Sequence, residues 1–357
     1  MAFTFSVKDT YRQAVEAASG GKQTVLYDDK GNPSIMNIIP KLSYKDVGLS
    51  DSTKALPAFV VDDADRPEVF VGTYMAMVHD GRAYSLPGQV PKVYTNMDQA
   101  IAYCRAKGPG WHCMTNAEYA AIALWCKKNG YYPRGNNNYG SDHAYPHEKC
   151  RPGTVGSDGR INLGLTGSGP NSWTHDGTPN GIYGLNGDAL EGAIGLRTLD
   201  GEIQILAGNN AAKNSADLTA GSAEWKAILQ DGTLVAPGTD GTIKVEPVSG
   251  NSGAARFVTT ITNRTTDSSY ASSQFKDLAV GDGISMPDLM KALALFPSDT
   301  SDHGNDNTWF RNTGERCFSR GGLWNVTSSA GVFYLDGDNP RSHSNDYIGF
   351  RPAYIVL

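Results

Sequence analysis

Apolar residues follow strand-like and helical patterns in the first third of the chain. Two β-rich runs, at residues 58–61 and 69–74, flank a polar turn. The segment from Thr95 or Asn96 through Cys104 has helical spacing and predicts a first helix of the main domain. A second helix is predicted from Thr115-x-x-Glu118, a capping box, to Gly130, which supplies a left-handed stop.

The pattern changes after residue 133. Gly, Asn, Ser and Asp dominate residues 133–280, and short β-like pieces such as residues 201–206 interrupt them. A further helix is predicted to open at Ser285, with Pro287 in its first turn, and to run to Leu295 before Pro297. Few helices, many short strands and long loops predict an α+β fold.

The same patterns suggest a domain organisation. Residues 1–50 read as a small N-terminal unit with a short helix over residues 10–18 and a strand at residues 24–27. Such a unit holds little core alone, so we expect it to pack on the main domain or to mediate oligomerisation. Residues 51–357 form the predicted main domain, with a loop-rich insertion at about 133–280 and a distinct C-terminal region at about 320–352.

Composition and charge exclude some classes of binding partner. The chain has 357 residues, 39% hydrophobic and 19% charged, with a formal net charge of −6. Because it has no Lys/Arg-rich run, we do not expect it to bind nucleic acid. No apolar stretch approaches the ~20 residues that span a bilayer, so we expect no membrane insertion. The first nine residues lack a basic head followed by an apolar core, and we expect a protein made without a signal peptide.

Two kinds of position alternate in the C-terminal region. Gly321, Gly322, Trp324, residues 330–333 and residues 348–351 supply apolar side chains, turn glycines and arginines that can tie down loops by forked hydrogen bonds. Between them lie polar and aromatic residues that we expect on turns. Surfaces rich in Tyr, Asn, Ser and Asp on a rigid frame are how antibody loops bind. An ordinary polar loop has the same composition, so composition alone does not distinguish it from a binding surface.

Several motifs, in order, resemble a known family. Arg320-Gly321-Gly322-Leu323-Trp324, residues 330–333 and Ile348-Gly349-Phe350-Arg351-Pro352 resemble the C-terminus of variable proteins from diversity-generating retroelements, of the kind found in gut phages and prophages. The same family is also resembled by three upstream segments, residues 57–62, 110–119 and 181–188, so the resemblance covers about residues 57–357. It implies a C-type-lectin-like fold, in the variant shared with formylglycine-generating enzymes.

The resemblance also implies which residues face a ligand. In that family, error-prone reverse transcription replaces template adenines, chiefly in Asn codons, and never yields Lys, Glu, Gln, Met or Trp. From Gly321 to Leu357 the chain has no Lys, Glu, Gln or Met, and Trp324 is its only Trp. The resemblance implies that the diversified, ligand-binding positions are Leu323, Asn325, Val326, Ser329, Tyr334, Asp336, Asp338, Asn339, His343, Asn345, Asp346 and Tyr347.

The expected function is therefore binding rather than catalysis, without a cofactor. The resemblance implies a receptor-binding protein of a phage tail, located in the virion or in the bacterial cell, that recognises a protein or glycan on a cell surface. A homo-oligomer would add avidity. Two alternatives remain: a carbohydrate-binding module with an invariant surface, and a relative of the formylglycine-generating oxidases. The oxidase chemistry needs a pair of C-terminal cysteines, whereas Cys317 stands alone in its region.

Two segments contain metal-ligand residue types. Residues 142–150 gather two His, two acids and Cys150, but Pro146 interrupts the helix that zinc spacing would need. Residues 302–307 offer oxygen ligands without the regular spacing of a calcium loop. We interpret both as polar loops and expect no metal site.

Overall fold

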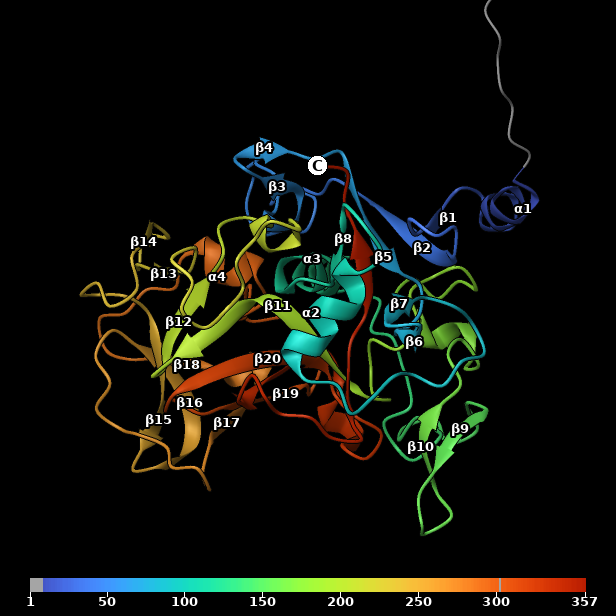
Figure 1. Cartoon of the computed structure of the whole chain (residues 1–357). Helices are drawn as coiled ribbons and strands as arrows, with labels where there is room; N and C mark the ends of the chain where they lie inside the picture. The colour runs from blue at the N-terminus through green and yellow to red at the C-terminus, as the bar shows by residue number, and fades with distance from the viewer. Residues whose placement is uncertain (1–8, 302) are drawn as a thin grey trace, which may run out of the picture.

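The computed structural model describes residues 9–301 and 303–357. It is an α+β structure in which strands predominate and one sheet closes into a barrel (Figure 1). The helices in the described residues are α1 (Thr10–Ser19), α2 (Met97–Arg105), α3 (Asn116–Lys128) and α4 (Asp288–Ala292). In this part of the chain no helix combines the length and the apolar character needed to cross a bilayer.

A five-stranded sheet joins the two ends of the chain. Its order is β1 (Gln23–Tyr27), β2 (Pro33–Pro40), β5 (Glu68–Gly72), β23 (Pro352–Tyr354) and β8 (Trp111–Cys113). The C-terminal strand β23 lies between β5 and β8, as the red arrow in Figure 1 shows. Strand β2 pairs with β5 from Met36 to Pro40, so this part of the N-terminal unit packs on the main domain.

The larger sheet forms the barrel. Going round it, β11 (Leu190–Leu199) pairs with β12 (Glu202–Ile205), and the ladder continues through β15, β16, β17, β19, β21 and β20 back to β11. The bounds of these strands are β15 (Lys244–Ser249), β16 (Ser252–Val258), β17 (Ala271–Gln274), β19 (Asn307–Phe310), β20 (Glu315–Gly321) and β21 (Gly331–Asn339). The range expected to be a loop-rich insertion thus supplies β11, a strand of ten residues in the barrel wall.

Short strands complete the structure around these two sheets. They are β3 (Val60–Val61), β4 (Ala64–Asp65), β6 (Met77–His79), β7 (Arg82–Tyr84), β9 (Pro152–Val155), β10 (Ile161–Gly164), β13 (Lys226–Ile228), β14 (Leu234–Val235), β18 (Ala279–Val280) and β22 (Ile348–Gly349). Among them, β9 and β10 form a separate hairpin, and β22 runs parallel to β11.

The helix ends show how local sequence sets the fold. Both reciprocal hydrogen bonds of the predicted capping box of α3 are present between Thr115 and Glu118. Asn96 caps α2 in the same way with Gln99. The helix expected at residues 285–295 is shorter than predicted: α4 begins after Pro287 and ends at Ala292, because Ala294 has a left-handed backbone that stops the helix.

Two buried arginines tie the C-terminal segment to the body. The Arg351 guanidinium donates to Glu191 at 2.7 Å, to the Gly72 carbonyl at 2.8 Å and to the Tyr183 carbonyl at 2.7 Å. Arg320 donates to Asn116 and to the carbonyls that follow α4. Both side chains are fully buried, which confirms the forked hydrogen bonding expected of them.

We expect Arg351→Leu to lower the free energy of unfolding by about 3–5 kcal/mol, because it leaves the Glu191 carboxylate buried without its cation. Chemical denaturation measures this loss. The exposed Arg151 is the matched control, and Arg151→Leu should cost less than about 0.5 kcal/mol. Equal small losses in both variants would contradict the role given to Arg351.

Candidate functional site

The C-terminal segment forms two loops on the barrel wall. The first loop, residues 322–330, joins β20 to β21 and contains one short 3-10 turn, Thr327–Ser329. The second loop, residues 340–347, joins β21 to β22. Most candidate ligand-facing residues lie on these loops.

Main-chain hydrogen bonds fix the first loop to the body. The Trp324 amide donates to the Asp188 carbonyl at 3.2 Å, and the Trp324 carbonyl accepts from the Tyr139 amide at 2.7 Å. The Thr327 amide donates to the Asn137 carbonyl at 2.9 Å. The indole of Trp324 is buried in an apolar cluster with Met75, Leu163 and Ala189. Peptide groups and one buried ring therefore set the path of this loop.

The second loop is fixed in the same way. The Arg341 carbonyl accepts from the Met97 amide at 3.3 Å, and the Asn345 carbonyl accepts from the Tyr94 amide at 2.9 Å. The Tyr347 carbonyl accepts from the Leu190 amide at 2.8 Å. Each of these bonds uses a carbonyl of the loop, so it does not depend on which side chain the loop residue carries.

Ten of the predicted positions are at least partly accessible. Asn325 is exposed, and nine others are half-buried: Leu323, Val326, Ser329, Asp338, Asn339, His343, Asn345, Asp346 and Tyr347. The structure gathers four of the ten into two contacting groups. Leu323, Val326 and Tyr347 pack against a shared apolar cluster, and the His343 and Tyr347 rings lie 6.0 Å apart.

Asp336, Asp338 and Asn339 lie on strand β21 rather than on the turns expected of them. Two of the predicted ligand-facing residues, Tyr334 and Asp336, are also buried there. Both lie within β21, and their exposed fractions are 3% and 8%. The phenol ring of Tyr334 packs against Trp309, with ring centroids 4.9 Å apart. Neighbouring side chains thus cover the outer face of this strand, and the expectation of exposed contacts is wrong for these two residues.

The Asp336 carboxylate accepts hydrogen bonds from residues at the end of its own strand. It accepts from the Asp338 amide at 3.1 Å and from the Asn339 side chain at 3.2 Å. Burial, and then the negative charge of Asp338, raise the pKa of Asp336. Removing this side chain would orphan those donors, so Asp336 is a structural residue of the site rather than a freely variable contact.

Trp309 is a site residue that the sequence patterns did not identify. It precedes the C-terminal region, on β19, and it packs on the same cluster as Leu323, Val326 and Tyr347. Its only sequence signal is an aromatic residue within a polar run, Asn307-Thr308-Trp309-Phe310. Register explains the contact: β19 runs parallel to β21, and Trp309 pairs with Asp336.

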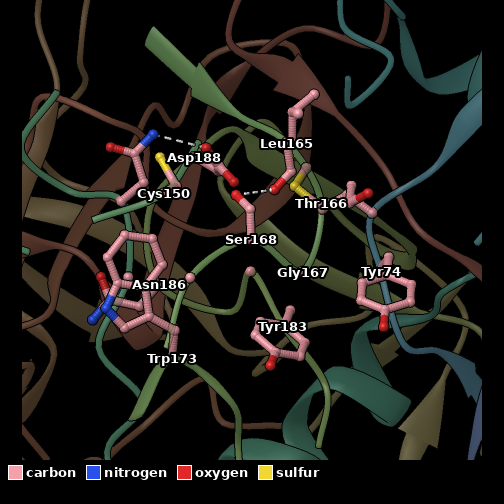
Figure 2. Close-up of a pocket in the computed structure, with 15 residues that line it drawn as sticks. Tyr74, Cys150, Leu165, Thr166, Gly167, Ser168, Trp173, Tyr183, Asn186 and Asp188 are labelled. Carbon is pink, nitrogen blue, oxygen red and sulfur yellow. Dashed lines mark hydrogen bonds between the residues drawn. The ribbon is translucent and has the colours of Figure 1, made fainter. Parts of the chain in front are cut away.

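A small cavity is lined in part by Asp188, whose carbonyl accepts from the Trp324 amide of the first loop (Figure 2). Its volume is about 20 Å³, which admits a water molecule but no organic substrate. Figure 2 shows Asp188 beside Cys150, with Tyr74 and Tyr183 on the other side of the cavity. The Asp188 carboxylate accepts from the Gly164 amide and from Asn136, both at 2.8 Å. Burial raises its pKa to about 6.

The two segments with metal-ligand residue types make hydrogen bonds within the protein. Asp142 accepts from the amides of Ala144 and Tyr145, and Glu148 pairs with Arg134. His303 is buried and bonds to Ser298 and to the Ser301 carbonyl, whereas Asp302 lies outside the described residues. Over residues 9–301 and 303–357, no three His, Cys, Asp or Glu side chains gather as metal ligands would.

Cys317 lies in β20 and is buried. Burial raises the pKa of its thiol to about 12, so the thiol stays protonated at neutral pH. A protonated thiol is a poor nucleophile.

Comparison with known proteins adds no relative: no family model matches the chain, and no curated protein matches it.

We expect Asp188→Asn to raise the Tm at pH 8 by roughly 2–4 °C. The Asp188 carboxyl has a pKa of about 6 in the folded protein, against an ordinary value of 3.8. Protonation of this carboxyl therefore stabilises the folded state fully below pH 3.8, and this stabilisation is lost as the pH rises through 6. The gain should therefore vanish near pH 4. Thermal melts from pH 4 to 8 test this, with the exposed Asp240→Asn as control. A variant that is less stable than the parent at pH 8 would refute it.

Proposed function

We propose that the protein binds a cell-surface receptor through a C-terminal surface whose side chains a retroelement diversifies, as the attachment protein of a phage tail. The main-chain anchoring of the two C-terminal loops is the observation that carries this proposal. A surface that must accept many side chains needs a backbone path that does not depend on them.

The anchors meet that requirement. Trp324, Thr327, Asn345 and Tyr347 bond to the body through peptide N–H or carbonyl groups. Arg341, which is not a predicted variable position, does so through its carbonyl and also through its guanidinium, which bonds to Glu315 and Asp98. A substitution at a neighbouring exposed position leaves those bonds in place. Binding then costs little backbone entropy, because the loops are ordered before the ligand arrives.

The accessible side chains have the layout of a binding surface. Leu323, Val326 and Tyr347 offer a half-buried apolar centre, while Asn325 and His343 are more polar neighbours. Protein interfaces commonly combine an apolar centre with a polar rim. A Tyr at such a centre supplies large contact area at low entropic cost.

The finer parts of the proposal follow from the sequence resemblance. We propose a C-type-lectin-like fold, and the pairing of β23 with β5, which places the C-terminal strand in the same sheet as β1 and β2, is compatible with it. The receptor is proposed to be a protein or glycan on a bacterial surface. Several copies in a homo-oligomer on the virion would convert weak contacts into avid binding.

An exchange of accessible side chains tests the function. We expect the double variant Asn325→Ser and His343→Ser to change the free energy of unfolding by less than about 1 kcal/mol. The same variant should label a different subset of a panel of bacterial strains when both proteins carry the same fluorophore. The change in labelling follows from altered contacts on an unaltered backbone.

The matched control is Trp324→Ala, which removes a buried ring and should cost about 3–5 kcal/mol. Identical strain labelling by the parent and the exchange variant would contradict the proposed binding surface. A large loss of stability in the exchange variant would contradict the claim that these side chains are free to vary.

A further inference from the structure

A groove of about 550 Å³ lies beside the two C-terminal loops. The β9–β10 hairpin forms one wall through Asp158 and Asn162, and Tyr94, Tyr139, Trp324 and Asp346 complete the lining. The hairpin is the green arm at the lower right of Figure 1. A volume of this size is typical of sites for small organic ligands.

Both tyrosines in the groove have an unusual backbone. Tyr94 has φ of 54° and Tyr139 has φ of 47°, in the left-handed region that bulky residues rarely adopt. Each residue donates its amide to a carbonyl of the C-terminal segment, Tyr94 to Asn345 and Tyr139 to Trp324. The conformation costs energy wherever it occurs, and such residues cluster at ligand sites. Glycine adopts this left-handed backbone at a lower energy than tyrosine does. The backbone conformation therefore does not explain why both positions carry an aromatic side chain.

The two rings have different surroundings. The Arg160 guanidinium lies over the Tyr139 ring at 3.4 Å from its centroid, and Tyr139 packs against the cluster around Trp324. The Tyr94 residue is 62% exposed. Tyr94 therefore offers an accessible aromatic face at the edge of the groove, and Tyr139 forms part of its fixed floor.

The charged groups in and beside the groove sum to one negative charge. Arg160 bonds to the Asp158 carboxylate at 2.7 Å and balances its charge. Asp346 adds one carboxylate, and Asn162 adds an amide that can both donate and accept. Within the described residues, no Lys or Arg lines the groove. This lining repels anions and suits a ligand with paired hydroxyl groups.

We propose that this groove binds an uncharged saccharide, one sugar ring stacking on Tyr94 while its hydroxyl groups bond to Asn162 and Asp346. The apolar face of a sugar ring fits an aromatic face, and carboxylate and amide groups take adjacent hydroxyls. Most of the lining lies outside the C-terminal region. Tyr94 and Asn162 therefore supply a constant saccharide contact, and Asp346 belongs to both the groove and the variable surface. The inference rests on the proposed function only in treating the two as one receptor site.

Tyr94→Gly is the decisive variant. Glycine accepts the left-handed backbone and keeps the amide that bonds to Asn345, so the variant should be as stable as the parent or more so. The exposed Asp80, with φ of 48°, is the matched control: Asp80→Gly relieves the same kind of strain at a residue that does not line the groove. Tyr94→Trp keeps an aromatic face and should preserve binding.

The probe is an array that carries uncharged, sialylated and phosphorylated saccharides, followed by calorimetric titration of the best uncharged oligosaccharide. The parent, Asp80→Gly and Tyr94→Trp should bind the uncharged class, and Tyr94→Gly should lose roughly tenfold or more in affinity. Binding of charged saccharides only, of no saccharide, or of an uncharged one with unchanged affinity in Tyr94→Gly would overturn the proposal.

The strain panel separates this inference from the proposed function. If the exchange of Asn325 and His343, which do not line the groove, changes strain labelling while Tyr94→Gly leaves saccharide binding unchanged, the proposed function stands and the inference fails. If Tyr94→Gly abolishes saccharide binding while the exchange variant labels the same strains as the parent, the groove stands and the proposed function fails.

Discussion

Peptide-to-peptide hydrogen bonds between the body and two C-terminal loops are the constraint on which the site depends. Asp188, Leu190 and the turns near Tyr94 and Asn137 present main-chain groups that the loops satisfy. Buried backbone groups must be paired, so a loop that left this path would orphan partners on both sides. Arg351 adds a buried cation that holds the strand after the second loop to Glu191. The loop conformation is therefore a property of the whole domain.

In this arrangement, the residues that fix the path of the two loops differ from the residues whose side chains are accessible on them. The body and the buried residues of the segment, among them Trp324 and Tyr334, set the shape of the surface. In the function we propose, exposed and half-buried side chains set what the surface recognises. The groove beside it extends this division, because the strained Tyr94 belongs to the body and stays constant whatever the loops carry. A receptor could then be held by one general contact and selected by several variable ones.

Sequence patterns predicted the elements whose signals are local. The capping box at Thr115 and the arginine forks follow from residue chemistry alone. The burial of Tyr334 and Asp336 did not follow, because it depends on β19 and the second loop covering the outer face of β21. Sequence patterns did not predict the groove either, because its walls come from residues near 94, 139, 158 and 346, which only the fold brings together.

Sequencing the 3′ end of the gene and its flanking DNA across a natural population tests the central claim most directly. The account predicts substitutions concentrated at accessible positions such as Asn325, His343 and Asp346, matching adenines in a nearby template beside a reverse transcriptase gene. Codons for Trp324 and Arg351 should stay fixed. An invariant 3′ end without a template, or variation spread equally over buried and exposed positions, would contradict the claim that a fixed backbone carries a diversified surface.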